Sequence, residues 1–268
     1  MHESTSAVQS ESEVYLLVGA YSSVGCALAQ RLHTRGAKLM MVGRDEDKLA
    51  LIADQVDSPY VIADATNFDM MTECFEATVK KYGRIDGVAS MTGSAHLKPA
   101  HLTTEFEWEV VAGSNLKAAF SVVRAATYAM MQGGGSIVLV SSTVHQLGLA
   151  NHEAMTAAKA GVEGLVRSAA STYAKHGVRV NCVAPGAGDR ERAEQAQAIG
   201  NALHEAVSVR EDERAETADQ IARVIDWLLK RGCSFTGQTI GVDQGLSSVR
   251  FKHPNRWSQF QVPNHCMT

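Results

Sequence analysis

The sequence has few of the residues from which disulfide frameworks and metal sites are built. Its 268 residues include five cysteines, an odd number, widely scattered and without a C-x-x-C pair. Cysteines in this pattern indicate reduced thiols in a cytoplasmic protein. The ten histidines show no spacing typical of metal ligands either. We therefore expect a cytoplasmic protein without a metal site.

Long apolar runs and a surplus of positive charge are also missing. No segment approaches the ~20 apolar residues that a membrane span needs. The polar first thirteen residues lack the basic start and apolar core of a signal peptide. The formal net charge of -4 is not the basic balance of a nucleic-acid-binding protein. We expect neither a membrane nor a nucleic acid as partner, and the 45% of hydrophobic residues suffices for a sizeable core.

The stretch that organises the chain is VYLLVGAYSSVG, residues 14–25. An apolar run breaks at Gly19, and Gly25 opens an amphipathic pattern, which predicts a buried strand, a tight turn and a helix. The first N–H groups of such a helix point at one spot, where a pyrophosphate binds well. Ser23 replaces the middle glycine of the usual fingerprint, so an ordinary strand-to-helix turn is the alternative interpretation.

Further apolar runs alternate with amphipathic patterns along the chain. The runs predict strands at 14–18, 38–42, 60–63, 85–90, 137–140, 178–183 and 239–242. The longest helices are expected over 103–131 and 152–176. This alternation predicts a single Rossmann-type, doubly wound α/β domain with a seven-stranded parallel sheet flanked by helices, spanning residues 14–249.

Three segments lie outside this alternation. Residues 1–13 form a polar N-terminal tail, and residues 250–268 form a C-terminal extension that either packs against a partner subunit or is loose. Residues 189–216 are charged and alanine-rich, and we interpret them either as a lid over the carboxyl edge of the sheet or as a solvated surface helix. Thr217 and Gln220 predict a capping box before the last helix.

Over residues 14–247 the chain resembles the short-chain dehydrogenase/reductase family. The glycine-rich turn, Asp64 after the third strand, Gly93 in ASMTG and Pro185-Gly186 after the sixth strand follow in family order and spacing. The resemblance implies a nicotinamide nucleotide cofactor and a small-molecule substrate. The cofactor contacts that it implies are Gly19, Tyr21, Ser22, Ser23, Val24, Gly25, Arg44, Asp64, Ala65, Gly93, Lys159, Pro185 and Gly186.

The same resemblance assigns catalytic roles to Asn115, Ser142 and Lys159. The family's catalytic tyrosine stands four residues before the lysine, and here that position is Met155. A thioether has no proton to give. Because losing a positioned acid costs about 10² to 10⁴ in rate, ordinary carbonyl reduction by the family mechanism is disfavoured.

Bacterial enoyl-acyl carrier protein reductases, divergent family members, carry Tyr-x-x-Met-x-x-x-Lys. Met155 and Lys159 match its latter half, and His152 occupies the tyrosine position. Helical spacing places the three on one face, which makes His152 a tentative proton donor. The alternative, which we favour, is a partly exposed histidine at the start of the helix. His96 and His145 also follow strand ends and are either donors or loop histidines.

Gly43 and Arg44 follow the second strand, where NAD enzymes usually place an acidic residue. Glycine leaves room there, and an arginine pairs with a 2′-phosphate. NADP(H) is therefore the expected cofactor, with NAD(H) as the alternative, because Asp45 offsets part of the attraction.

We expect a homodimer or homotetramer built through the helices at 103–131 and 152–176, as in the family. Small residues on these helices suit close packing; they are Ala118, Ala119, Ala125, Ala126, Ala169 and Ala170.

The leading interpretation is an NADP(H)-dependent oxidoreductase with an altered proton donor, acting on a carbonyl or an activated alkene. A nucleotide-binding protein without redox turnover, either a sensor or a silent partner subunit, is the second. A non-redox lyase or isomerase on the same fold is the third.

Overall fold

The computed structural model describes residues 12–186, 218–243, 245 and 247–248. Its centre is a seven-stranded sheet in the order β3-β2-β1-β4-β5-β6-β7, and every neighbouring pair is parallel. The strands are β1 (Val14–Val18), β2 (Lys38–Gly43), β3 (Tyr60–Ile62), β4 (Gly87–Ser90), β5 (Gly135–Val140), β6 (Val178–Pro185) and β7 (Thr239–Val242). This Rossmann-type sheet confirms the predicted fold class.

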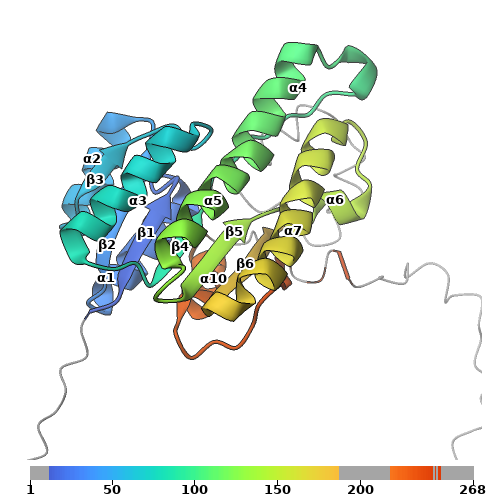
Figure 1. Ribbon diagram of the computed structural model, residues 1–268. Coiled ribbons are helices and arrows are strands. Elements are labelled where there is room, and N and C mark those ends of the chain that lie inside the picture. The colour runs from blue at the N-terminus through green and yellow to red at the C-terminus, as the bar shows by residue number, and fades with distance from the viewer. Residues whose placement is uncertain (1–11, 187–217, 244, 246, 249–268) are drawn as a thin grey trace, which may run out of the picture.

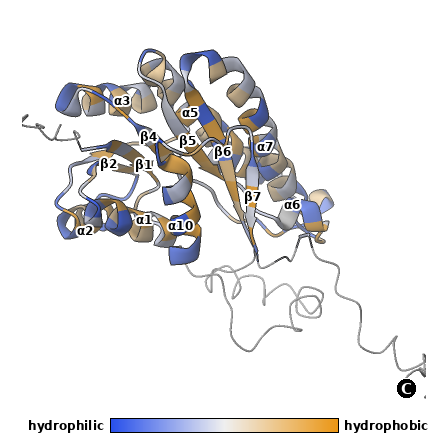
Figure 2. Cartoon of the chain, turned by 90° about the horizontal axis from the view of Figure 1, so that it is seen from below, coloured by the Kyte–Doolittle hydropathy of each residue, from blue (hydrophilic) through white to orange (hydrophobic). Residues whose placement is uncertain are grey.

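Helices cover both faces of the sheet (Figure 2). On one face lie α1 (Ser23–Thr34), α2 (Glu46–Gln55) and α10 (Ala218–Leu229); on the other lie α3 (Phe68–Tyr82), α5 (Ala118–Met130) and α7 (Glu153–Tyr173). Each layer forms its own apolar core against the sheet. Because both faces are covered, the inner strands are continuous apolar runs, and all five residues of β1 are buried.

The direction in which strands are added to the sheet reverses between β1 and β4. From β1 the chain adds β2 and β3 on one side, and it then adds β4 to β7 on the other side. In open parallel sheets, ligands bind outside the carboxyl ends of the strands at such a switch point. The loops after β1, β2, β3 and β4 therefore meet at the position where a ligand site is expected.

The predicted helix at 103–131 is interrupted, which corrects the sequence analysis. It consists of α4 (Glu105–Ala112), a π-helix η2 (Gly113–Lys117) and α5, and α4 lies in line with α5 in Figure 1. The side chains of Ser114 and Asn115 donate to the carbonyls of Val110 and Val111, at 2.8 and 3.0 Å. In a regular α-helix these carbonyls would accept hydrogen bonds from the backbone N–H groups four residues later. Because the two side chains bond to them instead, the helix is wider at this point.

Short elements complete the described chain. A 3-10 helix η1 (Ala100–Leu102) precedes α4, a short helix α6 (Val144–Leu147) follows β5, and a 3-10 turn η3 (Ala174–His176) follows α7. The N-terminus of α4 carries a capping box in which Thr104 and Glu107 bond reciprocally. Glu107 also accepts from Lys98, and these hydrogen bonds lower the pKa of its carboxyl to about 2.

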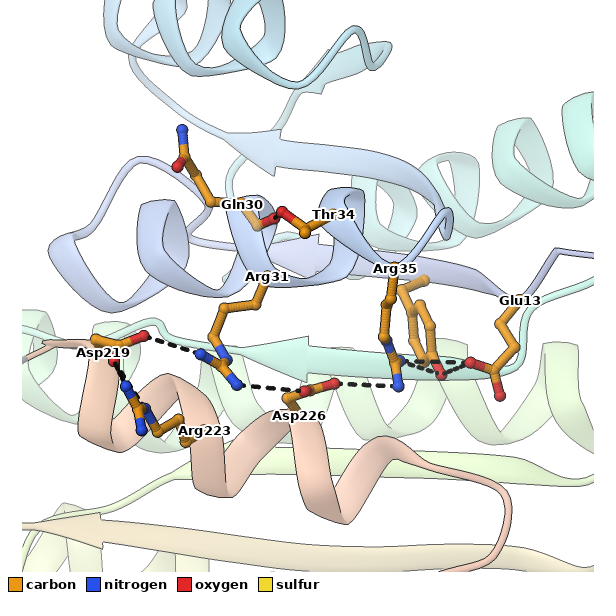
Figure 3. A network of polar contacts seen from close by, with 9 residues as sticks. Glu13, Gln30, Arg31, Thr34, Arg35, Asp219, Arg223 and Asp226 are labelled. Atoms are coloured by element: carbon orange, nitrogen blue, oxygen red, sulfur yellow. Dashed lines mark hydrogen bonds and ion pairs between the residues drawn. The ribbon is translucent and has the colours of Figure 1, made fainter.

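Charged side chains join α1 to α10 (Figure 3). Asp226 of α10 contacts Arg35 at 3.2 Å and Arg31 at 3.9 Å, and Arg31 also contacts Asp219 at 3.1 Å. Asp226 is buried, whereas Asp219 is more than two-fifths exposed. The network therefore contains one buried and one exposed carboxylate on a single helix.

The N-terminal tail, the proposed lid at 189–216, Thr217 of the capping box and the extension at 250–268 lie wholly or almost wholly outside the described residues. Within the described ranges, no helix has the length and apolarity to cross a membrane. In the same part of the chain, no cluster of three or more His, Cys, Asp or Glu side chains is arranged to hold a metal ion.

Candidate functional site

The turn after β1 is held in a tight conformation. Gly19 has a φ of 78°, and its N–H donates to the Val42 carbonyl at 2.9 Å. Ser22 is the N-cap of α1, accepting from the Gly25 N–H at 3.1 Å. A Cβ at Gly25 would lie 2.5 Å from the Ala20 carbonyl oxygen, so this position requires glycine. The glycines thus place the start of α1 directly behind the end of β1.

A groove runs along the carboxyl ends of the strands beside this turn. Fifteen residues line it: Val18, Gly19, Tyr21, Ser22, Gly43, Arg44, Ala63, Asp64, Ala65, Thr66, Met91, Thr92, Gly93, Ser114 and Ala118. Seven of the predicted cofactor contacts are among them, namely Gly19, Tyr21, Ser22, Arg44, Asp64, Ala65 and Gly93. The other six do not line the groove. Ser23, Val24 and Gly25 belong to the first turn of α1. Lys159 is on α7, and Pro185 and Gly186 stand at the end of β6. The loops after β1, β2, β3 and β4 therefore share one groove.

The Tyr21 ring covers the end of β2. A Cβ added to Gly43 would lie 2.6 Å from a ring carbon of Tyr21. An acidic side chain at position 43 would therefore displace the ring. Arg44, the next residue, is exposed and is the sole Lys or Arg among the described residues that line the groove.

Gly93 joins the groove to a second set of polar groups. A Cβ at Gly93 would lie 2.7 Å from Asn115 Oδ1 and 2.9 Å from Lys159 Nζ. Asn115 is buried and its Nδ2 donates to the carbonyls of Ser94 and Val111, while Oδ1 has no hydrogen-bond partner within the described chain. An unpaired amide oxygen and an ammonium group thus face the same small space, which only a glycine at 93 leaves open.

The end of β5 is fastened to α7 and β6. Lys159 Nζ donates to the Val140 carbonyl, and Ser141 Oγ donates to the Lys159 carbonyl, both at 3.1 Å. Ser142 is buried, and its Oγ lies 3.5 Å from the Pro185 carbonyl, which also accepts from the Thr143 N–H at 2.9 Å. Ser142, Lys159 and Pro185 therefore belong to one connected region.

Met155 is half-buried in the first turn of α7, one turn before Lys159. His152 is the N-cap residue of α7 and is buried, so the expectation of a partly exposed ring is wrong. Its Nδ1 lies 2.6 Å from the Ala150 carbonyl, which holds the ring against the chain. A carbonyl only accepts, so Nδ1 carries a proton and Nε2 is the nitrogen left for other chemistry.

The other two candidate proton donors, His96 and His145, lie in different kinds of structure. His96 lies in the loop after β4, as one interpretation had it, whereas His145 lies in the short helix α6 and not in a loop. His145 is tied to Ser142 and Glu163 by contacts at 2.5 and 3.4 Å.

The buried thiol near these groups is not a nucleophile. Burial raises the pKa of Cys182 to about 12, and the nearby Glu163 carboxylate acts in the same direction. At neutral pH the group is an inert thiol. Burial also raises the pKa of Cys26, which lies in α1 behind the glycine-rich turn.

Comparisons with known proteins identify the family. A family model described as enoyl-(acyl carrier protein) reductase matches residues 19–247. Levodione reductase of Leifsonia aquatica is 30% identical over 88% of this chain and 94% of its own length. A 3-oxoacyl-acyl-carrier-protein reductase of Thermotoga maritima is 32% identical over 88% of this chain and 98% of its own.

A solved structure of a short-chain type dehydrogenase/reductase from Mycobacterium ulcerans has a TM-score of 0.81 at 27% identity, covering 88% of this chain and 90% of that one. The chain therefore belongs to the short-chain dehydrogenase/reductase family of oxidoreductases, as its motifs indicated.

Several groove residues were not predicted as cofactor contacts. Met91 and Thr92 directly follow β4, so the rule that ligands bind at strand ends could have selected them. Thr66 follows β3 and belongs to the same class. Ser114 and Ala118 reach the groove from η2 and the start of α5, and no local sequence pattern signals that.

Proposed function

We propose that this protein binds NADP(H) and reduces a small to medium-sized apolar carbonyl or activated alkene, with a proton donor other than the family's tyrosine. The observation that carries the proposal is the position of Gly93. Gly93 lines the groove and also abuts Asn115 and Lys159, so a dinucleotide lying along the groove would bring its far end to these groups. Two of the relatives named above are reductases, which supports the direction of the reaction.

The residues of the groove fit a dinucleotide. The glycine at 19 lets the Met91 backbone lie against the turn, the glycine at 93 leaves space that a Cβ would fill, and the start of α1 presents N–H groups and a positive dipole end. Asp64 stands where an adenine contact is expected, and Arg44 where a 2′-phosphate contact is expected. When bound, the reduced nicotinamide supplies the hydride.

Each remaining group then has a role of its own. Lys159 holds the nicotinamide ribose and places positive charge at the site, while Ser142 hydrogen-bonds to the substrate oxygen. Asn115 holds a water next to Lys159 through its unpaired Oδ1. Met155 contributes an apolar wall but no proton. The proton comes from water or from His152, whose Nε2 donates when the ring is charged.

We expect NADPH to bind more tightly than NADH, and Arg44→Ala to remove most of the difference. A hydrogen bond to a charged group contributes about 1.5–3 kcal/mol, which corresponds to a loss of about 10- to 150-fold in NADPH affinity. NADH has no 2′-phosphate, so its affinity should change by less than about 3-fold. Titration of cofactor fluorescence measures both constants.

The matched control is Lys80→Ala, which removes an exposed cation from the last turn of α3, a residue that does not line the groove. It should leave both affinities unchanged. Equal affinities of the wild type for the two nucleotides, or an Arg44→Ala variant with unaltered selectivity, would contradict the assignment of NADP(H).

The second candidate function is nucleotide binding without turnover. Met155 in place of the family's acid is the observation that favours it. A wild type that binds NADPH but oxidises none of it, across a broad panel of ketones, aldehydes and activated alkenes, would establish this candidate in place of the first.

We also propose a homodimer or homotetramer that uses the α4, α5 and α7 faces, but not through the alanines expected from the sequence. Ala118, Ala119, Ala125, Ala126, Ala169 and Ala170 are all buried inside the chain. Large apolar side chains are exposed on α4 and α5 instead: Phe106 and Tyr128 at 76%, and Val110 and Phe120 at 47%. Faces of this kind mark interfaces between subunits.

We expect Tyr128→Asp to weaken self-association by about 30-fold or more, because truncating an aromatic anchor at an interface costs about 2 kcal/mol or more. Light scattering across a dilution series measures it. Leu51→Asp, a change of the same kind at a side chain 62% exposed on α2, is the control and should have no effect. A wild type that is monomeric at micromolar concentration would overturn the proposal.

A further inference from the structure

The segment that carries Ser142 is attached to α7 at three points. Two of them use Lys159: its Nζ donates to the Val140 carbonyl, and its own carbonyl accepts from Ser141 Oγ. The third lies one helical turn further along α7, where Glu163 contacts His145. The attachment therefore continues beyond the lysine to groups that have no role in the proposed reaction.

His145 bridges Ser142 and Glu163. Its Nδ1 lies 2.5 Å from the Ser142 carbonyl oxygen, and its Nε2 lies 3.4 Å from Glu163 Oε1. A backbone carbonyl can only accept, so Nδ1 is the donor of that hydrogen bond. With Nδ1 fixed in this way, the orientation of the ring is set by the carboxylate at its other end.

Burying the Glu163 carboxylate costs free energy. Its side chain is 8% exposed, and Oε1 makes no hydrogen bond by strict geometry in the part of the chain that the structure describes. A buried carboxylate is costly unless a polar group faces it, and His145 Nε2 is the group that faces Oε1, at 3.4 Å. An apolar side chain would fill this site on α7 more cheaply, so a purely structural role accounts poorly for the carboxylate.

We propose that His145 is a positioning residue: its hydrogen bond fixes the Ser142 peptide so that the serine hydroxyl faces the substrate oxygen, and Glu163 orients the ring that makes this bond. The proposal rests on the proposed function in that Ser142 is taken to contact the substrate. With Met155 in place of a tyrosine, Ser142 is the hydroxyl on this site that can orient the substrate, so its placement matters more than in an enzyme with both groups.

Two double variants separate the hydrogen bond to Ser142 from the contact with Glu163. In His145→Asn/Glu163→Gln the amide nitrogen takes the place of Nδ1 and can still donate to the Ser142 carbonyl. In His145→Gln/Glu163→Gln the amide nitrogen takes the place of Nε2, and the bond to Ser142 is lost. Both variants are uncharged at this site, so neither leaves a buried carboxylate unpaired.

The first readout needs no substrate. Amide hydrogen exchange of the peptides covering residues 141–149 should be close to that of the wild type in the Asn variant and at least about 10-fold faster in the Gln variant, because the segment loses an anchor. Equal exchange in the two variants overturns the inference, whatever the protein's activity.

The second readout uses whichever substrate the reductase panel identifies. The Asn variant should keep kcat within about 3-fold of the wild type, whereas the Gln variant should lose about 10- to 100-fold in kcat with an unchanged Kd for NADPH, as expected for a misplaced group. A loss of equal size in both variants, or a loss confined to KM, contradicts the positioning role. If hydrogen exchange responds as expected but the protein reduces no substrate, the result would support the anchoring of Ser142 by His145 and would refute the proposed function.

Discussion

Met155→Tyr should raise ketone reductase activity, measured as kcat/KM, by about 10² to 10⁴, the range that a positioned general acid contributes. The position is half-buried and one helical turn before Lys159 on α7. A phenol there would stand beside an ammonium group, which lowers the pKa of a tyrosine from its usual value of about 10. Lys159 and Asn115 already face the space beside Gly93, and Ser142 follows the residue whose hydroxyl bonds the Lys159 carbonyl, so we expect the substitution to supply the missing proton donor.

The matched control is Met155→Phe, which adds the same ring without the hydroxyl. It should show no gain, and a gain equal to that of the tyrosine variant would mean that packing, not proton transfer, is responsible. A tyrosine variant that binds NADPH normally but stays inert with ketones would show that Ser142 and Lys159 do not have the roles assigned to them. A wild type that reduces activated alkenes but not ketones would support the enoyl-type interpretation, and His152→Ala would then test the donor.

Asp226→Ala should lower the free energy of unfolding by about 2–4 kcal/mol, because it removes the buried carboxylate that lies between Arg31 and Arg35 (Figure 3). The two guanidinium groups would then repel each other across the α1–α10 contact, with Glu13 and Asp219 as their remaining partners. Both arginines are a quarter to a third exposed, so water reduces the loss relative to a fully buried pair. Urea denaturation measures the change.

Asp219→Ala, seven residues earlier on the same helix, is the control for burial. Its carboxylate is exposed and should contribute far less to stability. Hydrogen bonding to Arg223 lowers the pKa of Asp219 below its usual value of 3.8. Its small contribution is therefore present above that value and is lost as the pH falls through the lowered pKa. Equal losses for the two variants at neutral pH would mean that burial does not set the strength of this network.

Most of the sheet could be predicted because its strands are buried on both faces. Every residue of a run such as VYLLV is buried, so the run is apolar throughout and is easy to recognise, and a glycine follows it where the chain must turn. Strand ends were less certain: the predicted strand at 85–90 begins at Gly87. Asp86 turns its carboxylate to the Val14 N–H at 2.9 Å and to two arginines, which no apolar pattern could indicate.

The candidate site divides in the same way. Residues at strand ends could be chosen from order and spacing, and seven of them surround one groove, although their binding role stays a prediction. Burial of His152 and the pairing of His145 with Glu163 depend on how the loop between α6 and α7 folds back, which the residue pattern does not determine. The four-residue helix α6 carries no periodic pattern long enough to predict.

The π-helix η2 holds one more residue than an α-helix of the same length would, and this extra residue sets the direction in which the side chains of α4 point. An α-helix advances about 100° per residue, so deleting one residue between Gly113 and Lys117 would let α4 and α5 join as one regular helix. Every side chain of α4 would then rotate by about 100° around the shared axis, including the exposed Phe106 and the Glu107 that holds Lys98. Deleting one codon here would turn the exposed apolar side chains of α4 to another side of the molecule while leaving the sheet intact.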